Sequence, residues 1–306
     1  MGVHASSFKS HDRNKMFMSK LPQIVKNGAS EETYVASEDQ VKLSLSDESV
    51  SLPNEIIIVV LSFLSIEDLQ NCARTCHLFR DLTLSSSLWK MKCIREKRFP
   101  YNTSYCPSDW RKFYLKQPFT RNLIRNASGQ NDFQHWEIVK NGGDRFIVEP
   151  DKGHGSGEKP PELIALAGGK NCNFATSYGW CSKRQVIDLL SEGIEERLLD
   201  EMQPAFKVGE WYAARFDCGN IYSMKVTLLK KNSEKEDSII DFFTFGPLKT
   251  PQWAPSNWKE VSHIFQDYGP GLRYIKFEHE SKDTQFWAGH YGAKMAGSYV
   301  KVTFET

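Results

Sequence analysis

The feature that most constrains the fold is a change in hydrophobic period along the chain. Between about residues 51 and 98, apolar residues recur every three or four positions, as on one side of a helix. From about residue 119 onward, apolar and polar residues alternate in short runs that turn signals separate. The sequence therefore predicts a short helical part followed by a longer β-rich part.

The helical part is expected to contain three short helices. The first follows Leu52-Pro53, since proline near the first helical position loses no useful hydrogen bond. The second begins after the N-cap Ser65, and its apolar positions are Leu69, Cys72, Cys76 and Phe79. The third covers about 88–98, and a further helix is expected at about 109–115. The apolar surface left on the first helix can pack within the chain or receive a partner helix.

The β-rich part is expected to form an antiparallel sandwich. Turn signals at 141–144, 218–220 and 269–271 separate its runs, and half-polar alternation is typical of sheets with one solvated face. A weakly helical segment is expected at about 185–200. The predicted strands are 145–149, 211–215, 223–229, 239–245, 272–279 and 299–304.

Charge and composition exclude several classes of protein. The chain has 306 residues, with 39 Lys and Arg against 38 Asp and Glu, so its formal net charge is +1. This balance argues against nucleic-acid binding, and the six-residue aliphatic run 56–61 is far too short for membrane insertion. Seven cysteines without a Cys-x-x-Cys pair predict free thiols in a reducing, cytoplasmic setting, with no metal and no cofactor. The polar residues 1–50 are expected to be a disordered tail.

Residues 51–98 resemble an F-box. The resemblance rests on the Leu52-Pro53 opening, on Asp68-Leu69 in the second helix and on the later Leu88-Trp89, and it departs at Phe79, where the family often has Trp. It implies docking onto the S-phase-kinase-associated adaptor of a cullin–RING ubiquitin ligase of the SCF type. The positions that it assigns to this contact are Leu52, Pro53, Ile56, Leu61, Leu64 and Leu69.

Residues 119–306 resemble the F-box-associated domain of the sugar-recognising F-box proteins. The matching segments, in order, are 121–126, 141–146, 180–189, 264–271 and 286–294. The resemblance implies an α+β chain by domains: an α-helical F-box, a helical linker at 99–118 and a ten-stranded antiparallel β-sandwich of jelly-roll, galactose-binding-like type. It also implies binding to the chitobiose core of high-mannose N-glycans on misfolded glycoproteins, which are then ubiquitinated in ER-associated degradation.

The resemblance places a glycan site at three positions of this chain. The aromatic residue before the family's Trp-Cys pair is Tyr178, and the acid of its Asp-x-Gly turn is Asp217. The family's Tyr-Trp-Lys loop reads Phe286-Trp287-Ala288 here, so one hydroxyl and one cationic donor are missing. Each missing donor is expected to weaken binding by ~0.5–1.5 kcal/mol. Together they predict a ~5- to 100-fold lower affinity or a changed glycan preference.

The remaining residues suit a sugar. A tryptophan ring such as that of Trp287 can stack on the C–H face of a pyranose, and the carboxylate of Asp217 can accept hydrogen bonds from hydroxyl or acetamido groups. A structural role is the alternative for both, with Trp287 anchoring its loop and Asp217 bonding its own turn.

Two other functions stay open at this point. A glycan-blind receptor of the same architecture would recognise protein clients directly. This hypothesis is suggested by Ala288, which replaces the lysine of the family's loop. A sugar-cleaving enzyme would need a second carboxylate ~5–9.5 Å from the first. Asp217 has no such partner within the motif segments, and the sequence has no other catalytic motif, so a non-catalytic substrate receptor is expected.

Overall fold

The computed structural model describes residues 42–45, 48–99, 105–150, 155–233 and 235–303, and the statements below concern these residues. Most of the predicted tail lies outside them. Its last residues form an antiparallel hairpin of β1 (Lys42–Leu45) and β2 (Glu48–Ser51), which the absence of a hydrophobic period did not predict.

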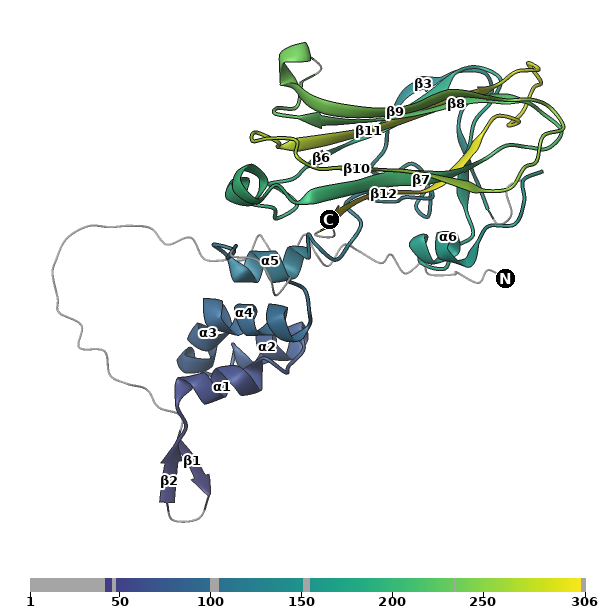
Figure 1. Cartoon of the computed structure of the whole chain (residues 1–306). Coiled ribbons are helices and arrows are strands. Elements are labelled where there is room, and N and C mark those ends of the chain that lie inside the picture. Colours follow the sequence, from purple (N-terminus) through teal and green to yellow (C-terminus); the bar gives the residue numbers. More distant parts are fainter. Residues whose placement is uncertain (1–41, 46–47, 100–104, 151–154, 234, 304–306) are drawn as a thin grey trace, which may run out of the picture. The chain divides into compact units, whose positions relative to one another are not determined.

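The helical part contains four helices before residue 98 and a fifth in the linker (Figure 1). Their bounds are α1 (Asn54–Leu61), α2 (Ile66–Cys72), α3 (His77–Leu84), α4 (Ser86–Arg95) and α5 (Trp110–Lys116). Pro53 precedes α1 as its N-cap residue, and Ser65 caps α2 by accepting from the Asp68 amide at 3.1 Å. Within the described ranges, no helix is long and apolar enough to cross a bilayer.

The predicted second helix is wrong in extent, because the chain breaks it into α2 and α3. The hydroxyl of Thr75 donates to the carbonyl of Cys72 at 2.7 Å, which occupies a carbonyl at the end of α2. Cys76 is fully extended, with φ −154°, and it starts α3. A common core nevertheless joins all five helices; its buried residues are Ile57, Leu61, Leu69, Leu82, Leu88, Trp89, Cys93, Trp110, Phe113 and Tyr114.

The β-rich part is a sandwich of two antiparallel five-stranded sheets, as predicted (Figure 1). The first sheet has the order β10-β7-β12-β5-β4, and the second has the order β3-β6-β11-β8-β9. The strand bounds are β3 (Glu137–Asn141), β4 (Ile147–Glu149), β5 (Asn173–Ala175), β6 (Cys181–Asp188), β7 (Ala205–Ala213), β8 (Asn220–Leu229), β9 (Ile239–Thr250), β10 (Lys259–Phe265), β11 (Tyr274–Asp283) and β12 (Lys294–Thr303).

The helical segment expected at 185–200 is wrong over most of its length. Its first residues belong to β6, and only its end coincides with a π-helical turn, Leu198–Met202, while a short helix, α6 (Pro161–Leu166), lies elsewhere. β6 alternates strictly between buried and half-buried residues, but Lys183 and Gln185 are among the buried ones. Because these inner-face residues are polar, the alternation of burial along β6 does not appear as an alternation of hydrophobic and polar residues in the sequence.

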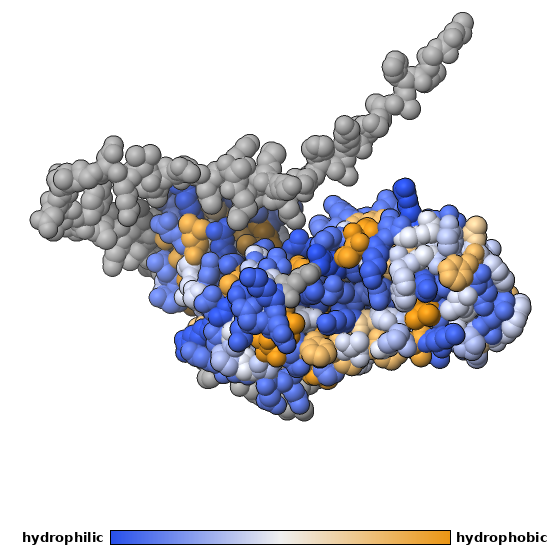
Figure 2. Space-filling view, turned by 90° about the horizontal axis from the view of Figure 1, so that it is seen from above, coloured by the Kyte–Doolittle hydropathy of each residue, from blue (hydrophilic) through white to orange (hydrophobic). Residues whose placement is uncertain are grey.

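The core between the sheets contains a charged cluster. Glu210 of β7 accepts from the hydroxyls of Tyr222 and Ser298, and its carboxylate lies 2.7 Å from Nδ1 of His279 in the opposite sheet. All four residues are buried. Burial alone would raise the pKa of Glu210, but His279, Tyr222 and Lys183 outweigh it and the pKa is lowered. The outer side of the second sheet, in contrast, is mostly hydrophilic, with hydrophobic residues in small separate groups (Figure 2).

Candidate functional site

The predicted glycan-site residues lie on loops at one end of the sandwich, which we call the loop end. The loop end consists of segments 142–146, 176–180, 214–219, 251–258 and 284–293. Strand register brings them together, because Cys181 and Tyr222 both pair with Ser281 and Asn220 pairs with Asp283 and Thr250. Loops that leave these strands therefore start side by side.

Asp217 does not act only as a turn cap, because it forms a two-point ion pair. Nε and Nη2 of Arg215 donate to the two carboxylate oxygens at 2.9 Å each. These hydrogen bonds lower the pKa of Asp217 and raise that of Arg215. The Asp217 side chain keeps 24% of its surface exposed, so the charged carboxylate remains open to a ligand.

Trp287 is connected to this ion pair through a third residue. Trp287 is 42% exposed, and its ring meets the ring of Tyr291 edge-on, with centroids 5.6 Å apart. The guanidinium carbon of Arg215 lies 4.2 Å from the centroid of the same Tyr291 ring. The structure thus joins the two predicted residues Asp217 and Trp287 into one surface of ring, cation and carboxylate.

The loop 284–293 is held from below by a buried carboxylate and an amide. Oδ1 of Asp283 accepts from the amides of Gln285 and Phe286 at 3.1 and 2.7 Å, and burial raises the pKa of Asp283. Oε1 of Gln285 accepts from the amide of Gly219 at 3.0 Å, which ties this loop to the turn of Asp217. Phe286 and Ala288 are left exposed on the rim, Phe286 with a left-handed backbone at φ 57°.

Tyr178 is partly buried and belongs to the neighbouring loop 176–180. A Cβ atom at Gly143 would lie 3.1 Å from Cδ1 of Tyr178, so this side chain borders the loop 142–146. The loop of Tyr178 also contacts the Trp287 loop, because Oγ of Ser177 donates to the carbonyl of Gly289 at 2.8 Å. Tyr178 therefore lies in the loop end, where its side chain is less exposed than that of Trp287.

Sequence reasoning missed four residues of the loop end: Arg215, Phe216, Trp253 and Tyr291. Arg215 stands two positions before Asp217, a spacing that suits an ion pair across a turn. Trp253 lies between Pro251 and Pro255, where a large aromatic residue has little reason to serve a strand. These were the available signals. No group of three or more His, Cys, Asp or Glu that could hold a metal ion occurs in the ranges that the structure describes.

A second candidate surface is an apolar stripe on α1. Ile56, Val59, Val60 and Phe63 follow the helical period and are 48, 39, 58 and 69% exposed. Pro53 is exposed beside them, and Leu52 and Leu64 are partly buried against the helical core. Leu61 and Leu69 are only 3 and 2% exposed, so in this structure they hold α1 and α2 in place.

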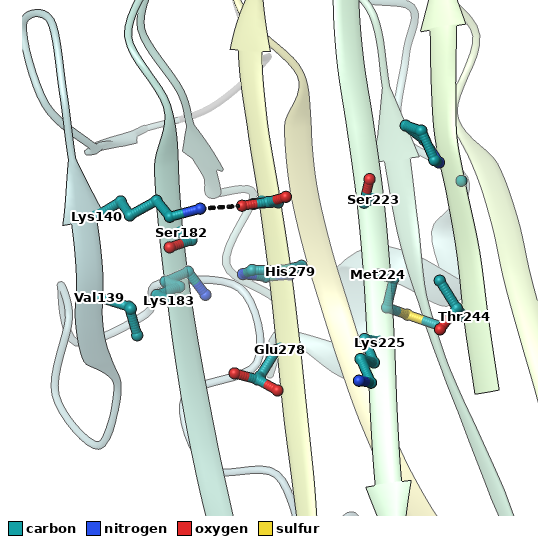
Figure 3. A pocket seen from close by; sticks show the side chains of 13 residues that line it. Val139, Lys140, Ser182, Lys183, Ser223, Met224, Lys225, Thr244, Glu278 and His279 are labelled. Carbon is teal, nitrogen blue, oxygen red and sulfur yellow. Dashed lines mark hydrogen bonds and ion pairs between the residues drawn. The ribbon is translucent and has the colours of Figure 1, made fainter. Parts of the chain in front are cut away.

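A hollow of about 320 Å³ lies on the strands of the second sheet rather than in the loops (Figure 3). Lys140 and Glu280 form an ion pair across it at 3.0 Å. Ser182, Ser223 and Thr244 contribute hydroxyls to its lining. Its lining includes no aromatic ring for the C–H face of a sugar, apart from the buried His279. The loop end therefore remains the better candidate for a ligand site.

Both parts of the chain match known families. A model of the "F-box associated region" matches residues 114–302, and a model described as "F-box-like" matches residues 50–95. The chain is 39% identical to bovine F-box only protein 6 over 82% of its own length and 92% of the relative. It is 35% identical to human F-box only protein 44, over 82% of the chain and 95% of the relative.

Solved structures give a weaker likeness. The carbohydrate-binding module TmCBM61, solved in complex with β-1,4-galactotriose, is similar to 60% of this chain and matches over 99% of its own length. The TM-score is 0.35 and the identity 12%, a level that supports no statement about ligands.

A helical part with an exposed apolar stripe, followed by a sandwich with a charged and aromatic loop end, defines a binding protein with two separate surfaces. The two family-model matches narrow this class to one family. The chain belongs to the family of F-box proteins that carry an F-box associated region. The pairing supports a substrate-recognition subunit of an SCF-type ubiquitin ligase, with the S-phase-kinase-associated adaptor and a cullin as the partners that an F-box implies.

Proposed function

We propose that this chain is a cytoplasmic, non-catalytic substrate receptor that binds the chitobiose core of high-mannose N-glycans. Its clients are misfolded glycoproteins exported from the endoplasmic reticulum, which the ligase ubiquitinates for ER-associated degradation. The observation that carries the proposal is the connected surface at the loop end: the exposed ring of Trp287 lies beside Tyr291, and Arg215 joins Tyr291 to Asp217.

This surface has the two elements that a sugar needs. The half-exposed Trp287 ring offers an apolar face for the C–H groups of a pyranose. The charged Asp217 offers oxygens to hydroxyl and acetamido donors, and its pairing with Arg215 fixes the direction of those oxygens. In this proposal Tyr178, Phe286 and Ala288 form the remaining wall and rim of the site.

The other end of the receptor is the adaptor contact. We assign it to α1 and its flanks, with Leu52, Pro53 and Ile56 at the opening of the helix and Leu64 at its end. Leu61 and Leu69 belong to the same assignment, and their burial means that they act by shaping the stripe from below. The exposed apolar stripe supports this assignment because a helix that is apolar toward solvent needs a partner.

A direct binding measurement on the full chain tests the glycan site. We expect calorimetric titration with chitobiose to give binding that both Trp287→Ala and Asp217→Ala weaken by at least tenfold. Phe242→Ala is a matched control, because Phe242 is a 57% exposed aromatic residue on β9 rather than on a loop. Absence of chitobiose binding in a folded, adaptor-competent wild type would overturn the proposal.

A glycan-blind receptor for protein clients is the second candidate. It is favoured by the rim of the site, where Phe286 is 70% exposed and the side chain of Ala288, two positions later, offers no donor. Under this candidate the loop end binds unfolded polypeptide without glycan. Equal binding of a glycoprotein before and after enzymatic glycan removal would favour it over the glycan receptor.

A further inference from the structure

The loop end exposes a second aromatic pair that the assigned glycan site does not use. Phe216 and Trp253 are 49 and 69% exposed, and their ring centroids are 6.0 Å apart at 51°. The Trp253 backbone is left-handed, with φ 66°, a conformation that residues with large side chains rarely adopt. Its amide donates to the carbonyl of Phe216 at 2.7 Å, which holds the two residues together. The fold thus maintains a costly backbone that leaves two rings in solvent.

This pair is continuous with the assigned site through Asp217. The Asp217 carboxylate leads through Arg215 and Tyr291 to Trp287. The Asp217 backbone leads to the aromatic pair instead, because Phe216 precedes it and Nε2 of Gln252, the neighbour of Trp253, donates to the Asp217 carbonyl at 2.9 Å. Both aromatic surfaces are therefore linked to Asp217, one through its carboxylate and the other through its backbone.

We propose that Phe216 and Trp253 form a second stacking subsite, which takes a further neutral pyranose of the same oligosaccharide beyond the two units of chitobiose. The inference rests on the proposed glycan function and extends it. The polar neighbours of the rings favour a sugar, because Arg215 and Asp217 stand beside Phe216 in the sequence and Gln252, beside Trp253, donates to the Asp217 carbonyl. Aromatic faces bordered by polar groups match the faces and edges of a pyranose.

Comparing two probes isolates the second subsite. Chitobiose should fill only the surface at Trp287, whereas a high-mannose oligosaccharide with the same core should fill both surfaces. We expect Trp253→Ala and Phe216→Ala each to lower the affinity for the larger oligosaccharide by ~3- to 10-fold, as measured by calorimetric titration. This is the effect expected from the loss of one ring contact. Affinity for chitobiose should stay within about twofold in both variants, whereas Trp287→Ala should weaken both probes.

Trp253→Gly keeps the test falsifiable if the alanine variant does not fold. Glycine adopts the left-handed backbone of position 253 without strain, so this variant removes the ring and preserves the loop. An unchanged ratio of the two dissociation constants in folded Trp253→Gly would overturn the second subsite but leave the chitobiose site intact. Wild-type protein that binds neither probe would overturn both. A loss seen only with an N-glycopeptide, and not with the free oligosaccharide, would assign the pair to polypeptide and overturn the sugar subsite.

Discussion

At the scale of single residues, the loop end combines exposed rings with fixed polar groups. Phe286 and Trp253 both have left-handed backbones, at φ 57° and 66°, and both present their rings to solvent. Such backbones raise the energy of a folded chain by ~1–2 kcal/mol per residue. A fold retains them where the surrounding hydrogen bonds, such as that from the Phe286 amide to Asp283, determine the loop.

The rim of the glycan site yields a prediction of gained affinity. Phe286→Tyr with Ala288→Lys restores one hydroxyl and one cationic donor at exposed positions, where neither change disturbs the core. We expect chitobiose to bind ~5- to 100-fold more tightly to this double variant, from two hydrogen bonds of ~0.5–1.5 kcal/mol each. The dissociation constant from calorimetry measures the change. Phe242→Tyr serves as the control, and an unchanged constant in the double variant contradicts the assigned rim.

The ion pair of Asp217 predicts how glycan binding depends on pH. Because Arg215 lowers the pKa of Asp217, its carboxylate stays charged below the ordinary aspartate value of ~3.9. The stability that the pair contributes is present above that value and is lost as pH falls through the lowered pKa. We expect chitobiose affinity to be constant from pH 7 to about pH 5 and to fall only below about pH 4. A titration of affinity with a midpoint near pH 6 would show that another group controls the site.

At the scale of elements, α1 is the helix whose exposed side has the clearest consequence. We expect Ile56→Asp with Val60→Asp to abolish binding of the purified adaptor while leaving the helical core folded, because both side chains are about half exposed. Leu61→Ala is the contrasting variant, because the Leu61 side chain is in the core and only 3% exposed. This substitution should lower the free energy of unfolding by ~2–5 kcal/mol. Adaptor affinity and circular dichroism separate the two effects. Retained affinity in the double aspartate variant would move the contact away from this stripe.

The elements also show how far the sequence could be interpreted. Helix starts were predictable, because proline and serine act within one turn of the residues that they cap. The end of α2 was not, since it depends on a bond from Thr75 to the Cys72 carbonyl. The sequence missed strands β3, β5, β6 and β10 of the sandwich. Two of them were missed for opposite reasons: β3 is an edge strand that is largely exposed, and β6 turns Lys183 and Gln185 toward the core. In the candidate site, the family motifs indicated Asp217 and Trp287, whereas the contacts of Tyr291 depend on folding.

At the scale of the whole molecule, a nearly neutral chain places its charges unevenly. Most ionisable residues are at the surface, but Glu210, His279 and Lys183 are enclosed between two apolar sheets. The Lys183 ammonium has no hydrogen-bond partner among the described residues and lies 3.1 Å from the centroid of the Trp136 ring. Burial lowers the pKa of Lys183 well below its ordinary value. The sandwich therefore depends on polar bonds in its interior as well as on apolar packing.

Removing the centre of this cluster should destabilise the sandwich. Glu210→Ala leaves His279 and the Tyr222 hydroxyl buried without their partner, and it removes a link between the two sheets. We expect the free energy of unfolding to fall by ~1–3 kcal/mol for each buried hydrogen-bonding group that is left without its partner. Urea unfolding followed by tryptophan fluorescence measures it. A loss below ~1 kcal/mol would mean that the cluster contributes little to stability.

Lys183→Met should have the opposite effect on stability. Methionine has a similar length and carries no charge that must be buried, so the cost of enclosing an ammonium without a hydrogen bond disappears. We expect a melting temperature equal to or higher than that of the wild type, measured by calorimetry at pH 7. A clear decrease would show that attraction to Glu210 outweighs the cost of burying the Lys183 charge.

The close contact of two glycine segments within the loop end limits how this receptor can diversify. A Cβ atom at Gly179 would lie 2.5 Å from the amide nitrogen of Gly143, and one at Gly143 would lie 2.8 Å from the amide nitrogen of Gly179, so neither position accepts a side chain unless the backbones shift. The loops are therefore fixed where they meet, and tolerable variation is confined to the exposed tips at positions such as 286 and 288. A lineage that starts from this scaffold can acquire a new ligand by exchanging one or two surface side chains, without rebuilding the frame that presents them.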